Sequence, residues 1–203
     1  AQLNNHGGEF PFTFFGLTPD STKEEIKECL MNFTKGDNKL LDHSQAYKIT
    51  LDTGWDVPPG VLHAPGTLCP YEPQFASDVY AMYQSVLYGG HVVGKELLWK
   101  NCPDEERGNI DYLLDVIDWD LNTDPDLHKN RFMKPLVITD NEAYTEEWIC
   151  YKCPVVSAKR LTVLPGATVT IKDNAPYGMY MLQGHGTFGG KPIESPTQIR
   201  FGQ

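Results

Sequence analysis

One stretch, GWDVPPGVLHAPG at positions 54–66, restricts the fold of this chain more than any other. It places three prolines and three glycines around one histidine, His63. Proline fixes the backbone angle φ and lacks an N–H group, whereas glycine permits turns that other residues resist. A helix or a long strand cannot run through such a stretch. It therefore predicts a rigid turn that presents the His63 imidazole, within a fold built from short elements.

The rest of the chain alternates between strand-like and helix-like patterns. Ser21 and Thr22 are candidate helix caps, followed by acidic residues and then by apolar residues at helical spacing. The last third returns to short strands, and GHGTFGG at 184–190 predicts a tight connection between two of them. We expect strands at 8–17, 46–55, 77–89 and within 160–202, a helix that begins after Thr22 and ends at Gly36, and a second helix at 109–121.

Composition and charge exclude several classes of protein. Hydrophobic residues make up 40% of the chain, which is enough for a packed core. The formal net charge of −10 argues against nucleic acid and membranes as partners, and no apolar run approaches the roughly 18 residues of a membrane span. No signal peptide is visible, so we expect a cytoplasmic protein. The chain opens at Ala1 and ends in IRFGQ, like a strand cut short, so we also expect a fragment.

The five cysteines are an odd number and do not predict a disulfide framework. Only Cys150 and Cys153, in CYKC, are close in sequence, and no second pair follows at the spacing of a zinc site. We interpret these two as reduced thiols on or near a strand.

An acidic segment, DWDLNTDPDLHK at 118–129, begins like a calcium-binding loop. Thr123 stands where such a loop needs its turn glycine, and Lys129 stands where it needs a bidentate glutamate. We interpret it as a solvated acidic segment.

Two segments far apart in the chain share a spacing, which indicates an internal repeat of one small β unit. The first copy carries ligand-type side chains, whereas the second carries a lysine, an amide and a phenol at the matching positions. The matched positions are Asn4, His6, Glu9 and Gly16 in the first copy and Lys172, Asn174, Tyr177 and Gly184 in the second.

The residues around His63 resemble a known family. PPGVLH at 58–63 resembles the second motif of the cupins, P-x-G-x-x-H, whose histidine is a metal ligand inside a small β-barrel. Glu9 to Gly16 resembles the end of their first motif, E-(x)6-G. YEPQFASDVYAMY at 71–83 is similar to a strand of the mannose-6-phosphate isomerase-like cupins. The resemblance implies a two-domain, or bicupin, protein.

For the fold, the resemblance implies a mainly β chain with two cupin-type barrels, each a double-stranded β-helix and both incomplete, joined by a helical connector. The expected domains are an N-terminal cupin at 1–89, a helical or irregular connector at 90–147 and a C-terminal cupin at 148–203. In the first barrel His6, Glu9 and His63 hold one divalent metal ion. Two imidazoles and a carboxylate suit Zn²⁺, Mn²⁺, Fe²⁺ or Ni²⁺. The simpler alternative is a rigid surface turn with an incidental histidine.

Three functions remain open on this reading. In a sugar isomerase-like enzyme the metal polarises a carbonyl or hydroxyl group, and Glu72 is the candidate base that moves a proton between neighbouring carbons. A non-catalytic bicupin binds a carbohydrate or another small polar ligand. A dioxygenase uses Fe²⁺ held by two histidines and one carboxylate. We expect a small, sugar-like substrate and a homo-oligomer.

Overall fold

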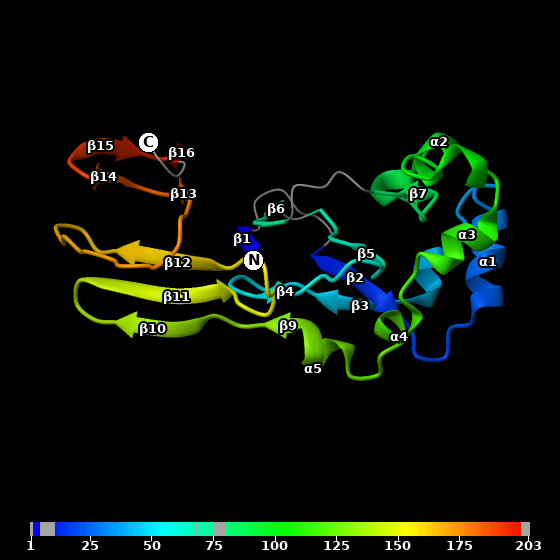
Figure 1. Cartoon of the computed structure of the whole chain (residues 1–203), viewed down its shortest axis with the longest axis horizontal. Coiled ribbons are helices and arrows are strands. Elements are labelled where there is room, and N and C mark those ends of the chain that lie inside the picture. The colour runs from blue at the N-terminus through cyan, green and yellow to red at the C-terminus, as the bar shows by residue number, and fades with distance from the viewer. Residues whose placement is uncertain (1, 5–10, 68, 75–79, 200–203) are drawn as a thin grey trace. The chain divides into compact units, whose positions relative to one another are not determined.

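Short strands dominate the structure, as the glycine and proline pattern predicts (Figure 1). The computed structural model describes residues 2–4, 11–67, 69–74 and 80–199. The chain forms two units, Ala1–Leu164 and Pro165–Gln203. The expected mainly β class is confirmed. The described sheets have two or three strands each and none of them closes into a barrel, so the two cupin barrels stay a prediction.

In the first unit, strands pair antiparallel across long sequence distances. The central strand is β2, which lies between a strand that follows α1 and the strand that carries His63. The pairs are β1 (Gln2–Asn4) with β6 (Cys69–Pro70), β2 (Phe12–Leu17) with both β3 (Ser44–Lys48) and β5 (His63–Ala64), β4 (Gly54–Trp55) with β9 (Phe132–Met133), and β7 (Val86–Leu87) with β8 (His91–Val92).

Helix α1 (Lys23–Met31) begins where the sequence predicts. The Glu25 N–H donates to the Thr22 hydroxyl, and the Thr22 N–H donates in return to the Glu25 carboxylate, which completes a capping box. The helix buries Ile26 and Leu30 and lies beside α3. It ends at Asn32, before the predicted Gly36, which lies in the following turn.

The expected helix at 109–121 is two helices, α3 and α4. Asp118 interrupts it because its side chain caps α4 by accepting from the Leu121 N–H, while its own N–H donates to the Gly60 carbonyl at 3.1 Å. The remaining helical segments are short. They are η1 (Leu40–His43), η2 (Tyr88–Gly90), α2 (Lys95–Leu98), η3 (Asp104–Glu106), α3 (Ile110–Asp115), α4 (Trp119–Asn122) and α5 (Leu127–Arg131).

The expected strand at 46–55 is also divided. Its middle forms a turn in which the Thr53 hydroxyl donates to the Thr50 carbonyl at 2.7 Å and Asp52 takes a positive φ of 63°. The strand expected at 77–89 is wrong for residues 80–85, which are irregular, and residues 77–79 lie outside the described part.

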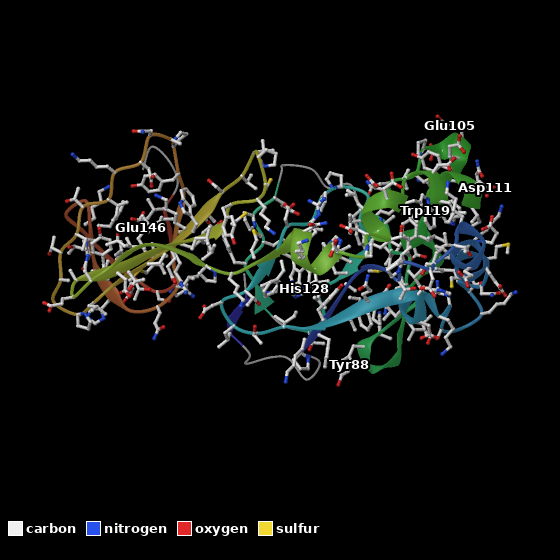
Figure 2. The ribbon with its side chains drawn as sticks, turned by 90° about the horizontal axis from the view of Figure 1, so that it is seen from below. Tyr88, Glu105, Asp111, Trp119, His128 and Glu146 are labelled. Carbon is white, nitrogen blue, oxygen red and sulfur yellow. The ribbon has the colours of Figure 1, made fainter. Side chains whose placement is uncertain are left out.

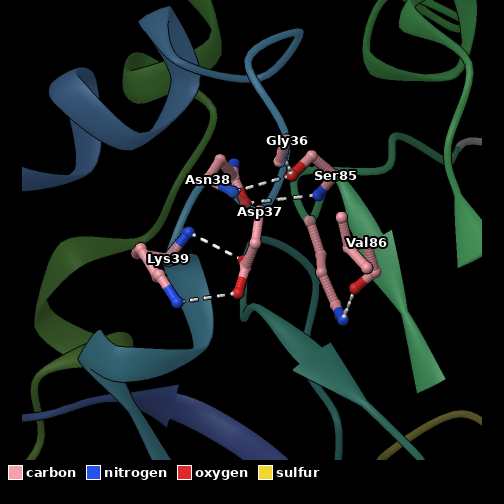
Figure 3. Close-up of polar contacts among 7 residues, drawn as sticks. Gly36, Asp37, Asn38, Lys39, Ser85 and Val86 are labelled. Atoms are coloured by element: carbon pink, nitrogen blue, oxygen red, sulfur yellow. Dashed lines mark hydrogen bonds and ion pairs between the residues drawn. The ribbon is translucent and has the colours of Figure 1, made fainter. Parts of the chain in front are cut away.

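The backbone of Tyr83 and Ser85 bonds to a buried asparagine, Asn38, and Figure 3 shows the bonds to Ser85. Asn38, which is 3% exposed, donates from Nδ2 to the Tyr83 carbonyl at 2.9 Å and accepts from the Ser85 N–H at 3.2 Å. The Asn38 N–H donates to Ser85 Oγ at 2.8 Å, and that hydroxyl donates to the Gly36 carbonyl at 2.7 Å. These four bonds satisfy backbone groups that a strand would otherwise pair.

The segment at 90–147, expected to be a helical or irregular connector, contains strands near its C-terminal end. β10 (Leu136–Asp140), β11 (Tyr144–Cys150) and β12 (Ala158–Val163) form an antiparallel three-stranded sheet. Lys159 pairs with Glu146 at 3.0 Å, and Arg160 pairs with Glu147 at 2.6 Å. Because successive residues of a strand point to opposite faces, a slip of one residue would separate both pairs. The two ion pairs therefore fix the register of β11 and β12.

The second unit holds two small antiparallel pairs. Gly189 and Gly190, with φ of 57° and 80°, form the two-residue loop of one of them. Positive φ at both positions is what a type I′ hairpin turn requires. The tight connection predicted for GHGTFGG is confirmed at its last two residues, whereas 185–188 form strand β14. The pairs are β13 (Met179–Met181) with β16 (Thr197–Ile199), and β14 (His185–Phe188) with β15 (Lys191–Glu194).

The main hydrophobic core packs α1 against α3 and against the irregular segment that contains Tyr83. Tyr83 is 7% exposed, and its hydroxyl donates to the Leu113 carbonyl at 2.8 Å. Burial raises the pKa of the Tyr83 phenol well above its ordinary value, and the ionisable groups of Cys102 and Tyr112 add to the effect.

We expect alkaline pH to destabilise the first unit partly through Tyr83. The phenol stays protonated in the folded state but ionises near pH 10 in the unfolded chain, so stability falls as the pH rises above about 10, by at most about 1.4 kcal/mol per pH unit. Tyr83→Phe should reduce this slope and should cost about 1 kcal/mol at pH 7 by losing one hydrogen bond. Urea unfolding from pH 7 to 11 measures both effects. An unchanged slope in Tyr83→Phe, or an equal change in the exposed control Tyr177→Phe, would contradict the assignment.

Candidate functional site

His63 lies on β5, where it pairs with Phe15 of β2. Its imidazole is exposed, and Nδ1 lies 3.0 Å from the Val61 carbonyl. A carbonyl oxygen only accepts hydrogen bonds, so this bond requires the proton to be on Nδ1. The neutral ring then carries its lone pair on Nε2. Metal-binding histidines usually donate their other ring N–H to an oxygen in this way, which fixes the tautomer and the ring orientation.

The loop before His63 is rigid and tightly packed. Gly60 has a φ of 79°, and a Cβ added there would lie 3.0 Å from the Asp118 backbone nitrogen and 3.2 Å from the Val116 carbonyl oxygen. Glycine is therefore required at position 60 by conformation and by space. The prolines at 58 and 59 restrict the chain on the other side of this turn. The predicted turn is confirmed.

A buried side-chain amide, that of Asn122, holds this loop against α4. Its Nδ2 donates to the Gly60 carbonyl at 2.8 Å, and its Oδ1 accepts from the Leu62 N–H at 2.9 Å. Asn122 is 0% exposed. The two bonds bracket Val61, the residue whose carbonyl accepts from His63. Asn122 thus positions the backbone that orients the imidazole.

Strand β2 completes the support from the opposite side. The Gly16 N–H donates to the Leu62 carbonyl at 2.8 Å. A Cβ at Gly16 would lie 2.7 Å from Leu127 Cδ1 and 2.9 Å from the Asn122 carbonyl oxygen, so only glycine fits. Both backbone groups of Leu62 are therefore bonded, one to β2 and the other to Asn122.

The interpretation of 118–129 as a solvated segment is wrong for two of its residues. Asn122 and Leu127 are 0% and 1% exposed and pack beneath the His63 loop, although the acidic residues between them are not buried. No sequence signal marks this burial, since Asn122 stands at a position where a calcium-binding loop also accepts asparagine.

An aromatic cluster continues from His63 along the same side of β2. Phe15, which is 1% exposed, lies 6.5 Å from the His63 ring and 5.0 Å from the Trp55 ring, measured between centroids. Trp55 in turn contacts Tyr47, His128 and Phe132. We call Trp55, Tyr47, His128 and Phe132 the aromatic cluster. Its distances are 4.7 Å for Tyr47–Trp55, 5.3 Å for both Trp55–His128 and Trp55–Phe132, 5.4 Å for Tyr47–His128 and 4.6 Å for the stacked pair His128–Phe132.

The aromatic cluster is partly open to solvent. His128, labelled in Figure 2, is exposed, and the other three rings are half-buried. Burial raises the pKa of Tyr47, and the charge of Asp124 raises it further. The Tyr47 hydroxyl donates to Gln45 Oε1 at 2.7 Å. The cluster therefore combines apolar ring surface with polar groups at its edge.

Of the other predicted site residues, His6, Glu9 and Glu72, the structure describes Glu72 alone. His6 and Glu9 lie outside the described residues. Glu72 is exposed in the irregular segment after β6. Among the residues that the structure describes, no three histidine, cysteine, aspartate or glutamate side chains gather into a group that could hold a metal. The ligand set of His6, Glu9 and His63 therefore stays a prediction.

Comparison of the chain with protein families, with curated proteins and with solved structures found no match. Within the described ranges, every helix is too short or too polar to cross a membrane.

We expect Asn122→Ala to lower the free energy of unfolding by about 2 to 3 kcal/mol, because it leaves the partly buried Leu62 N–H and the Gly60 carbonyl without this partner. Asn130→Ala is the matched control, since Asn130 is an exposed amide on the next helix and bonds only to Asp124 through its side chain. That control should change stability by less than about 0.5 kcal/mol. Chemical denaturation of both variants gives the comparison, and equal effects would refute the role of Asn122.

Proposed function

We propose that this protein is a metal-dependent enzyme of cupin type that acts on a carbohydrate, with one divalent ion held by His6, Glu9 and His63. The observation that carries the proposal is the hydrogen bond from His63 Nδ1 to the Val61 carbonyl, which leaves Nε2 with a lone pair on an exposed edge. On this proposal the two units belong to two incomplete double-stranded β-helix barrels. A homo-oligomer and a cytoplasmic location remain predictions.

The strand pairing supports the ligand set. β1 ends at Asn4 and pairs with β6, and β2 begins at Phe12 and pairs with β5. The segment that carries His6 and Glu9 is thus joined at both ends to strands whose partners flank the loop after His63.

The residues present suit a divalent transition metal better than calcium or magnesium. Two imidazoles favour Zn²⁺, Mn²⁺, Fe²⁺ or Ni²⁺, whereas calcium and magnesium prefer sites made of oxygen alone. A bound ion would supply a Lewis acid for a carbonyl or hydroxyl of the substrate. Glu72 is the proposed base, since its exposed carboxylate is accessible to a substrate proton.

The aromatic cluster favours a carbohydrate as the ligand. The apolar C–H face of a sugar ring packs well on aromatic side chains, while its hydroxyl groups bond to polar groups at the edge. Trp55 and His63 both contact Phe15, so the cluster and the imidazole share one buried neighbour.

The same cluster also supports the second candidate, a protein that binds carbohydrate without catalysis. This candidate needs only the aromatic cluster and no metal. A ferrous dioxygenase uses the same two histidines and one carboxylate, so the identity of the bound metal separates it from an isomerase.

We expect His63→Ala to abolish metal binding, because it removes the ligand that the loop orients. His91→Ala is the matched control, since His91 is also exposed on a short strand of the first unit. Elemental analysis of both purified variants and of the wild type measures bound metal, and circular dichroism confirms that each is folded. Metal-free wild type would support the non-catalytic candidate, and iron alone would support the oxygenase. Full metal content in His63→Ala would refute the proposed site.

We expect Trp55→Ala to weaken sugar binding about tenfold or more, which corresponds to about 1.4 kcal/mol of lost contact. Trp55→Phe keeps an aromatic ring and should retain most of the affinity. Tyr88→Ala, which removes another exposed aromatic residue, is the control. Calorimetric titration with mannose and with mannose 6-phosphate gives the affinities. Equal affinity for wild type and Trp55→Ala would exclude the aromatic cluster as the binding surface.

A further inference from the structure

Two cysteines at the end of β11 have no part in the proposed site. Cys150 is the last residue of β11 and pairs with Ala158, and Cys153 follows in the turn between β11 and β12. Both are free thiols and both are half-buried. Cys150 Sγ lies 3.8 Å from the Val156 carbonyl oxygen, so the Cys150 thiol faces into the turn that contains Cys153.

The two thiols are three residues apart, one at the end of β11 and the other in the turn that follows it. Burial raises the pKa of Cys150, and the charge of Cys153 is the next largest cause. The separation of two residues, C-x-x-C, is also one at which proteins close reversible disulfides.

The two residues between the cysteines fasten the turn to another part of the first unit. The Tyr151 hydroxyl donates to the Lys134 carbonyl at 2.8 Å. The Lys152 ammonium donates to the carbonyls of Asn130 and Phe132 at 2.8 and 2.9 Å. These carbonyls lie at the C-terminal end of α5, where backbone acceptors lack helical partners and a cation is favourable.

The segment whose carbonyls accept hydrogen bonds from Lys152 contains two residues of the aromatic cluster. His128 and Phe132 stack on one another, and both contact Trp55. Lys152 therefore links the turn that holds Cys153 to the aromatic cluster, since its ammonium bonds to the residues on either side of Arg131.

We propose that Cys150 and Cys153 are a redox modification site, which forms an internal disulfide by exchange with a low-molecular-weight disulfide and thereby releases Lys152 from α5 and loosens the aromatic cluster. One thiolate attacks the small disulfide and forms a mixed disulfide, with one small thiol leaving. The second cysteine then attacks the protein sulfur of that mixed disulfide, and the second small thiol leaves. The two cysteines lose two electrons and two protons in all, and the small disulfide is reduced to two thiols.

The release of Lys152 follows from the geometry of a disulfide. Bonded cysteines bring their Cβ atoms to about 3.5 to 4.5 Å. Cys150 is held at its own end by the pairing with Ala158, so any closing of the two Cβ atoms to that distance moves the turn residues 151–153. Such a movement of the Lys152 backbone would weaken the hydrogen bonds that its ammonium makes at 2.8 and 2.9 Å.

The first test is whether the disulfide forms. The wild-type chain is incubated with oxidised glutathione, and its thiols are counted under denaturing conditions. We expect the count to fall from five to three, with a loss of two hydrogen atoms by mass spectrometry. Cys150→Ser and Cys153→Ser should each form no internal disulfide, whereas Cys102→Ser, the matched control, should still form it. Five remaining thiols, or stable glutathione adducts in place of the internal bond, would overturn the proposal.

The second test is whether the aromatic cluster responds. Trp55 fluorescence is obtained as the difference between wild type and Trp55→Phe, before and after oxidation. We expect a red shift of the Trp55 emission on oxidation, and no such shift in Lys152→Met, which keeps the side-chain stem but cannot donate. A disulfide that leaves Trp55 unchanged, or that shifts it equally in Lys152→Met, would refute the link. Neither readout depends on a bound metal or on sugar binding.

Discussion

The buried amide of Asn122 is the interaction on which the arrangement around His63 depends. It bonds both to the carbonyl of Gly60 and to the N–H of Leu62. The residue that caps its helix, Asp118, also donates its N–H to the Gly60 carbonyl. A loop with three prolines has few N–H groups with which to pair, so its remaining polar groups must find partners elsewhere. One side chain supplies two of these partners.

The buried amide of Asn38 also bonds to backbone groups, in another part of the first unit. It replaces a missing strand partner for the backbone at 83–85, as Asn122 does for the loop at 60–62. Small sheets of two or three strands leave many backbone groups at their edges, and those that are buried must be satisfied. Buried asparagines, which carry both a donor and an acceptor, meet that need with one residue.

Local features of the fold could be predicted from the sequence, and long-range ones could not. The capping box of Thr22 and Glu25 and the hairpin at Gly189 and Gly190 depend on neighbours in sequence, so their patterns were sufficient. The turn at Asp52 divided an alternating pattern that otherwise predicted one strand. Its position is tied to an ion pair with Arg160, which lies far along the chain and leaves no local signal.

The candidate site likewise contains residues that could be predicted from the sequence and residues that could not. His63 and its rigid loop were predicted, because proline and glycine act on the chain where they stand. Asn122 was missed, since an asparagine within an acidic run has the composition of a solvated loop, and its bonds to residues some sixty positions earlier leave no trace in spacing. The aromatic cluster was missed because its members come from four separate elements, β3, β4, α5 and β9.

The support around His63 has a consequence for binding. Hydrogen bonds to Gly60 and Leu62 and the prolines of the loop are in place before any ligand arrives, so the ordering of this loop is a cost of folding and not of binding. A ligand that meets a preformed imidazole orientation loses less conformational entropy than one that must order the loop itself. The loop therefore favours tight binding by whatever group His63 contacts, and this holds whether that group is a metal ion or part of a sugar. The energy that enforces the orientation comes from Asn122 and the packing beneath the loop, which is why a residue without any contact to a ligand can still control its affinity.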